Sequence, residues 1–113
     1  MLEDGEDGGR RHTRVSYSSG SVMIRCSKSS PFVSGVLIDI SISGCLIRTA
    51  EPLTVGPEDV IELRIDLNSL VFRVLGFVRH ASKGSHTLGI EFHHMSDQNR
   101  SDLEIFIDYH AAA

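Results

Sequence analysis

The first residues able to do chemistry are three arginines near the N-terminus, Arg10, Arg11 and Arg14. A guanidinium is permanently charged and offers a planar fork of N–H donors, which suits phosphate and carboxylate oxygens. Four carboxylates precede these arginines in residues 1–9, a tail that we expect to be disordered. A solvated basic segment beside an acidic one would have the same composition. The arginines alone therefore do not distinguish an anion site from an ordinary surface.

A second polar cluster interrupts a strand pattern in residues 38–49. Three isoleucines alternate there with polar residues, as in a half-buried strand, yet aspartate and glycine are depleted in strands. Asp39, Ser41 and Gly44 all lie in this short stretch. We expect Asp39 and Ser41 to lie on the same outward face, about 7 Å apart. The alternative is a strand end with an Asx-type or serine turn and a glycine bend.

Patterns for catalysis or metal binding are missing from the sequence. It contains no nucleophile elbow, phosphate-binding loop or zinc-type cysteine spacing. His93 and His94 are adjacent, but neighbouring strand residues point to opposite faces and do not easily share one ion. Ordinary surface histidines are the preferred interpretation. We predict a protein that is not an enzyme and has neither a metal site nor a cofactor.

Charge and length limit the class of partner. The chain has 113 residues and a net charge of −4, all of it attributable to the tail of residues 1–9. The remainder is neutral, which argues against a DNA- or RNA-binding surface but leaves room for a small anion held by a few arginines. No apolar run is long enough to span a membrane, and the N-terminus lacks the features of a secretory signal. We therefore expect a cytoplasmic protein whose cysteines, Cys26 and Cys45, are reduced thiols within strands.

Short alternating segments separated by turn residues dominate the chain. We expect strands in residues 15–27, 32–41, 45–49, 60–67, 70–80 and 86–94, with a loop at 50–59 and a bulge at Gly76. The period then changes to that of a helix after an N-cap at Ser96. Leu103, Phe106, Ile107 and His110 fall on one face of this helix. We expect this face to pack on the strands or to close one end of them, and a surface for a partner is the alternative. About six strands at such spacing predict a small antiparallel barrel or sandwich.

The two polar clusters together resemble a known pair of motifs. RRHTR followed by DISISG is similar to the RxxxR and D/N-x-S-x-x-G motifs of PilZ domains. The strand GFVRH, the G-I-E-F sequence at residues 89–92 and the L-x-x-F-I sequence at residues 103–107 also fit that family. The resemblance covers roughly residues 10–110. It implies a mainly β fold, a six-stranded antiparallel barrel with a C-terminal helix and a flexible N-terminal arm, in a PilZ-like domain of residues 10–113.

The resemblance also implies that the ligand is the bacterial second messenger cyclic di-GMP. Arg10 and Arg14 would contact a guanine edge, stack on a base or clamp a phosphate. Asp39 would accept the N1–H and N2–H donors of guanine, which adenine lacks. Ser41 would donate to a phosphate or the base, and Gly44 would allow close approach of the ligand or of the arginine segment. Ordering of the arginine arm would then change the surface offered to a downstream protein partner.

Several points stay open from the sequence. Arg11, Ser43 and Arg79 are further candidates for contacts around the ligand, and His12 or Tyr17 for stacking, because the chain has no tryptophan. One bound ligand or an intercalated pair are both compatible with Gly9. An interaction module of the same fold that binds no nucleotide is the main alternative. A single-stranded nucleic-acid binder ranks last, because only 6% of the residues are aromatic.

Overall fold

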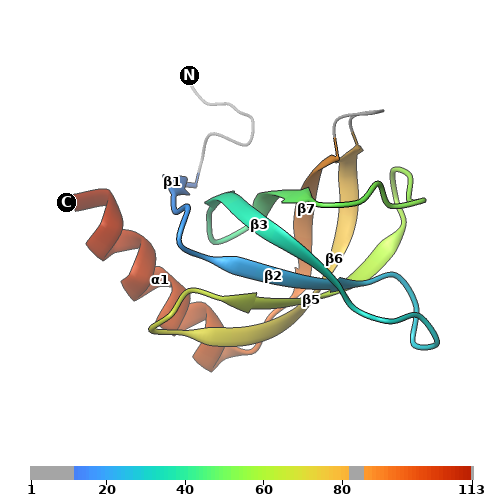
Figure 1. Ribbon diagram of the computed structural model, residues 1–113. Coiled ribbons are helices and arrows are strands. Elements are labelled where there is room, and N and C mark those ends of the chain that lie inside the picture. The colour runs from blue at the N-terminus through green and yellow to red at the C-terminus, as the bar shows by residue number, and fades with distance from the viewer. Residues whose placement is uncertain (1–11, 82–85, 113) are drawn as a thin grey trace, which may run out of the picture.

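Seven strands and one helix make up the part of the chain that the computed structural model describes, residues 12–81 and 86–112 (Figure 1). Arg10, Arg11 and the expected disordered tail lie outside the described residues, as does most of the expected flexible arm. In chain order the elements are β1 (Val15–Ser16), β2 (Ser21–Arg25), β3 (Val33–Ile40), β4 (Gly44–Thr49), β5 (Val60–Asp66), β6 (Val71–Ala81), β7 (Thr87–His94) and α1 (Asp97–Ala112).

The strands form one antiparallel sheet that closes into a barrel. Their order is β1-β3-β2-β5-β6-β7-β4, and an additional pairing of β3 with β4 joins the two ends of a six-stranded ring. The short β1 is a seventh strand beside β3. The predicted fold class, a mainly β six-stranded antiparallel barrel with a C-terminal helix, is confirmed. The difference is that the first predicted strand is two strands, β1 and β2, separated by a turn.

The alternation of apolar and polar residues explains which side of each strand faces inward. In β5 the side chains of Ile61, Leu63 and Ile65 are buried, whereas Glu62 and Arg64 between them point outward. Burying apolar surface stabilises the fold by roughly 25 cal/mol per Å². The inward-facing side chains of all strands meet in one core inside the barrel.

The predicted bulge in β6 is present at Gly76. The register of β6 against β7 shifts between Leu75 and Gly76. A β-carbon on Gly76 would collide with the side chain of Ile90 on β7. The bulge therefore lets the longest strand bend around the barrel while Ile90 packs directly over its backbone.

Helix α1 covers one end of the barrel (Figure 1). It begins as predicted, because the Ser96 hydroxyl accepts a hydrogen bond from the Asn99 amide at 3.1 Å. Leu103, Phe106 and Ile107 are buried against the barrel and His110 is partly buried, so the predicted packing face is confirmed. Among the described residues, no helix is long and apolar enough to cross a membrane.

Tyr17 connects α1 to the turn between β5 and β6. Its ring lies edge-on to Phe106 and His110 at centroid distances of 5.0 and 5.1 Å. Its hydroxyl donates to the Leu67 carbonyl at 3.1 Å and accepts from the Asn68 side-chain amide at 3.0 Å. The side chain is thus committed to packing, so the suggestion that Tyr17 stacks on a ligand is not supported.

The two cysteines are free thiols at different depths. Cys45 is buried in β4, where it pairs with Ile40 on β3 and Ile90 on β7. Cys26 follows the last residue of β2 and is half-buried. The expectation that both lie within strands is therefore correct only for Cys45, and the two do not face each other across neighbouring strands.

Candidate functional site

The short strand β1 brings the two polar clusters of the sequence together. Val15 and Ser16 pair with Ile40 and Asp39 of β3, which places the preceding residue, Arg14, beside the Asp39 side chain. The Arg14 guanidinium donates to the Asp39 carboxylate at 2.6 Å. Arg14 is 48% exposed and Asp39 is 20% exposed, so water still screens the pair. Such a pair contributes at most about 1 kcal/mol, which a ligand contact can replace.

A bulge in β3 explains why Asp39 points outward at this position. Leu37 pairs with Ile47 of β4, but the next pair is Asp39 with Leu46, so one extra residue is inserted at Ile38. Leu37 and Ile40 are both buried, which strict alternation would not allow. The bulge thus keeps two apolar side chains in the core and turns Asp39 towards Arg14.

Ser41 does not lie on the outward face beside Asp39. Its side chain is 0% exposed, because β3 ends at Ile40 and the chain turns inward. The Ser41 hydroxyl accepts from the Ser43 amide at 3.2 Å, and the Ser41 amide donates to the Gly44 carbonyl at 2.8 Å. The predicted orientation of Ser41 is wrong, and the alternative of a serine turn holds. The alternation expected through Ile42 likewise stops at Ile40.

Gly44 is required by the barrel itself. It pairs with Glu91 on β7, and a β-carbon there would collide with the backbone carbonyl of Ile90. Among the described residues, the close approach that this glycine permits is that of the neighbouring strand β7. Gly44 also lines the pocket described below, and its role towards a ligand stays a prediction.

An open pocket of about 660 Å³ lies where β3, β4 and β7 meet the segment before β1. This volume falls within the range of ligand pockets in proteins, about 300–1,000 Å³. The candidate residues Arg14, Asp39, Ser43, Gly44 and Arg79 line it, together with His12. Ser41 and Tyr17 are not among its lining residues.

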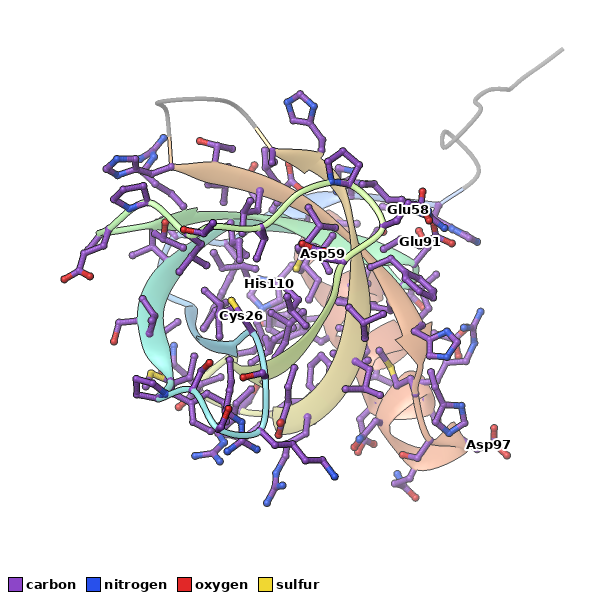
Figure 2. All side chains as sticks on the ribbon, turned by 90° about the vertical axis from the view of Figure 1, so that its right-hand side faces the viewer. Cys26, Glu58, Asp59, Glu91, Asp97 and His110 are labelled. Carbon is purple, nitrogen blue, oxygen red and sulfur yellow. The ribbon has the colours of Figure 1, made fainter. Side chains whose placement is uncertain are left out.

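Arg79 lines the opposite side of the pocket and is held by two carboxylates. Its guanidinium donates to Glu91 at 2.6 Å and to Glu58 at 2.7 Å, and it lies over the Phe77 ring at 5.0 Å. The hydrogen bond to Glu91, followed by that to Glu58, raises the pKa of Arg79. Figure 2 shows Glu58 and Glu91 next to each other on this side of the barrel.

Sequence reasoning did not single out these two glutamates, of which Glu91 lines the pocket and Glu58 contacts its lining residue Arg79. Glu91 pairs with Gly44 across the β4–β7 seam, and Glu58 has a left-handed backbone with φ of 77° in the loop before β5. Neither position carries a local signal that points to Arg79. Each arginine that lines the described pocket is thus matched by a carboxylate.

The Cys45 thiol lies in the floor of the pocket. Burial raises its pKa to about 12, Asp39 adds to that rise, and Arg14 opposes it. At neutral pH the thiol is therefore protonated and a poor nucleophile. Among the described residues, no group of three or more histidine, cysteine or carboxylate side chains is placed to hold a metal ion.

Comparisons with known proteins agree with this architecture. The sequence model of the PilZ domain matches residues 9–109. The PilZ domain of Escherichia coli YcgR, solved with c-di-GMP, has a TM-score of 0.73 at 17% identity, over 91% of this chain and 92% of that one. The Bacillus subtilis inhibitor of motility MotI has a TM-score of 0.72 at 16% identity, over 91% of this chain and 49% of that one.

The PilZ domain of CeSA from a cellulose-synthesising bacterium has a TM-score of 0.63 at 14% identity, over 84% of this chain and 94% of that one. A search of curated proteins by sequence gives no match. The chain spans about half the length of MotI and of a second, longer YcgR structure. Since one family accounts for residues 9–109 and the same barrel recurs in these structures, the chain belongs to the PilZ domain family.

Proposed function

We propose that the pocket between β3, β4 and β7 binds cyclic di-GMP. The observation that carries this proposal is the contact between Arg14 and Asp39, one residue from each sequence motif, at the pocket. A relative of the same fold, the PilZ domain of YcgR, was solved with c-di-GMP. The ligand offers two anionic phosphates for arginine and two guanines whose N–H donors suit a carboxylate.

In this proposal the ligand separates Arg14 from Asp39 and uses both. The Asp39 carboxylate turns from the guanidinium to the N1–H and N2–H donors of a guanine. Arg14 is then available for a phosphate or for the O6 and N7 edge of the base. Arg10, Arg11 and Arg79 supply additional positive charge. His12, which lines the pocket, stacks on a base. Ser41 acts indirectly, by holding the turn that carries Ser43 and Gly44.

The proposed biological role is that of an effector without catalytic activity. The contacts of Arg14 change when the ligand binds, and residues 10–14 take up a new arrangement over it. This alters the surface beside β1, which a downstream protein then recognises. The energy for the change comes from the difference in affinity of the ligand for the two arrangements.

The test is a calorimetric titration of the full chain with cyclic di-GMP. Arg14→Ala and Asp39→Ala should each weaken binding about 10- to 100-fold, because each removes a multidentate contact to the ligand. Arg25→Ala is the matched control. Arg25 pairs with Glu62 across two strands at 2.7 Å and is outside the pocket, so its loss should leave the affinity unchanged.

The choice of nucleotide sharpens the test. Cyclic di-AMP keeps both phosphates but lacks the guanine donors, so it should not bind with comparable affinity if Asp39 reads the base. Equal binding of both nucleotides would mean that the site recognises the phosphates and does not distinguish the bases.

The alternative is an interaction module that binds no nucleotide, and the pairing of Arg14 and Arg79 with carboxylates favours it. Absence of heat with folded wild-type protein at several temperatures would decide for this alternative.

A further inference from the structure

Three arginines form a patch on the outer face of the barrel, away from the nucleotide pocket. Arg25 on β2, Arg64 on β5 and Arg73 on β6 make up this arginine patch. The register aligns Arg64 directly opposite Arg73, and Arg25 opposite Glu62. None of the three lines the pocket at β3, β4 and β7. The patch is therefore a separate surface of the molecule.

The three arginines of the patch outnumber the two carboxylates on the same outward face of β5, Glu62 and Asp66. Glu62 accepts two hydrogen bonds from Arg25, at 2.7 and 3.2 Å. Within residues 12–81 and 86–112, neither Arg64 nor Arg73 forms a salt bridge with a carboxylate. Like charges directly opposite each other on paired strands destabilise a sheet. This arrangement costs stability in the isolated protein, and an acidic partner would remove that cost.

An aromatic ring holds two of these arginines in position. The guanidinium groups of Arg25 and Arg64 each lie 4.6 Å from the centre of the Phe32 ring. Stacking uses the flat face of a guanidinium and leaves the N–H donors at its edge available. Arg64 is thus partly preorganised to accept a carboxylate in its plane, which lowers the entropy lost on binding.

Apolar side chains border the arginines. Leu75 on β6 pairs with Glu62 on β5, and Leu75 is 44% exposed. A hollow of about 340 Å³ begins beside Arg73 and Leu75 and reaches His94 and Ser96 near the start of α1. Arginine and phenylalanine are both enriched in protein–protein interfaces.

We propose that the arginine patch docks an acidic segment of a partner protein, with carboxylates on Arg64 and Arg73 and an apolar side chain against Leu75. The patch has only three arginines, and one of them is already paired with Glu62. This is few for nucleic acid, where six to ten phosphate contacts are common. It is also few for an anionic membrane surface, which basic clusters of about four to eight residues recognise. An acidic polypeptide with interspersed apolar residues matches both the charge and the hollow.

NMR of the arginine Nε–H groups tests this proposal in the intact chain. The probe is a synthetic peptide in which aspartate and glutamate alternate with leucine and phenylalanine. Saturable shifts are expected at Arg64 and Arg73, and the matching peptide with asparagine and glutamine should produce none. The double variant R64Q/R73Q should weaken binding at least about tenfold, since each lost charged hydrogen bond is significant.

The control variant is Arg48→Gln, since Arg48 is an exposed arginine on β4 and the strands β2 and β3 lie between it and β5. It should bind the peptide like wild type, and the single variants R64Q and R73Q show whether each arginine contributes. Equal shifts at Arg48, Arg64 and Arg73 would overturn the proposal. Binding of a single-stranded RNA or of phosphatidylserine vesicles to the patch, without peptide binding, would overturn it too. Neither result would affect the nucleotide titration, because the two surfaces share no residue.

Discussion

The residues at the start of β4 contribute to the barrel before any ligand binds. Gly44 makes room for the Ile90 carbonyl, Cys45 is buried beneath the pocket, and Ser41 is buried in the turn that precedes them. Asp39 of the same motif differs from these residues, because its carboxylate is partly exposed and bonds to Arg14. The Asp39-x-Ser41-x-x-Gly44 motif, which resembles a ligand-binding motif, therefore also contributes to closing the barrel.

Replacing Gly44 by alanine should destabilise the fold. The new β-carbon would collide with the Ile90 carbonyl, a backbone atom in the β4–β7 seam that cannot move without disturbing the strand pairing. We expect the free energy of unfolding to fall by about 1–3 kcal/mol, measured by urea denaturation. Gly56→Ala is the control, because a β-carbon there meets nothing within 4 Å. Equal stability of the two variants would contradict this account of the seam.

Cys45 should make stability fall at high pH. Its pKa is about 12 in the folded protein, whereas an exposed thiol has a pKa of about 8.5. Above about pH 9 the unfolded chain loses this proton while the folded chain keeps it, so the unfolded state binds fewer protons. Stability should then decrease by up to about 1.4 kcal/mol per pH unit until about pH 12, and no such term exists below about pH 8.

The measurement is urea unfolding of wild type and Cys45→Ala from neutral pH to about pH 10. The variant should lose the extra slope above about pH 9. Cys26→Ala should retain most of it, because Cys26 is half-buried and its raised pKa comes from partial burial and then from Asp59. A wild-type slope identical to that of Cys45→Ala would show that the thiol ionises freely in the folded state.

Among the secondary-structure elements, β1 and the bulge of β3 position the site. Strand β1 has only two residues, yet its pairing with Ile40 and Asp39 places Arg14 at the pocket. The bulge at Ile38 turns Asp39 to meet it. Helix α1 also contacts this region, since Tyr17, which follows β1, packs on Phe106.

The N-cap of α1 offers a test at the scale of the helix. Ser96→Ala removes the hydrogen bond from the Asn99 amide to the serine hydroxyl, so stability should fall by about 1 kcal/mol. Ser101, an exposed residue inside α1, is the matched control. Ser101→Ala should preserve or slightly raise stability, because alanine has the higher helix propensity. Thermal denaturation followed by circular dichroism distinguishes the two variants, and equal losses would argue against the cap.

For the whole molecule, the barrel separates two surfaces. The pocket is lined by residues of β3, β4 and β7 and by Arg79 of β6, whereas the arginine patch lies on β2, β5 and the part of β6 that carries Arg73. Because the ring of strands is closed, both surfaces rest on the same core. The proposed partner on the arginine patch would therefore leave the pocket accessible to the proposed ligand.

Cyclic di-GMP should stabilise the entire fold if the proposed function is right. A ligand that binds only the folded state adds about 2.7 kcal/mol at a concentration of 100 times its Kd. For a domain of this size, the Tm should then rise by several degrees and increase further with ligand concentration. Differential scanning calorimetry of wild type and Asp39→Ala provides the comparison. A constant Tm for wild type, or an equal rise in both proteins, would contradict the assigned site.

Much of the fold follows from the sequence because it depends on neighbouring residues. The alternation in β5, the bulge at Gly76, the N-cap at Ser96 and the buried face of α1 all reflect local backbone preferences and the burial of apolar side chains. The paired motifs indicated the family for the same reason, since each is a short run of residues in a recognisable order.

Only the tertiary structure decided how the site is assembled. The inward turn of Ser41, the contact of Arg14 with Asp39 and the approach of Glu58 and Glu91 to Arg79 each depend on contacts beyond the local strand pattern. A shift of one residue in the register reverses the side on which a strand residue lies, and a bulge is such a shift. The sequence therefore identified candidate residues such as Arg14 and Asp39. The orientation of each side chain and its bonding partner depend on how the barrel closes.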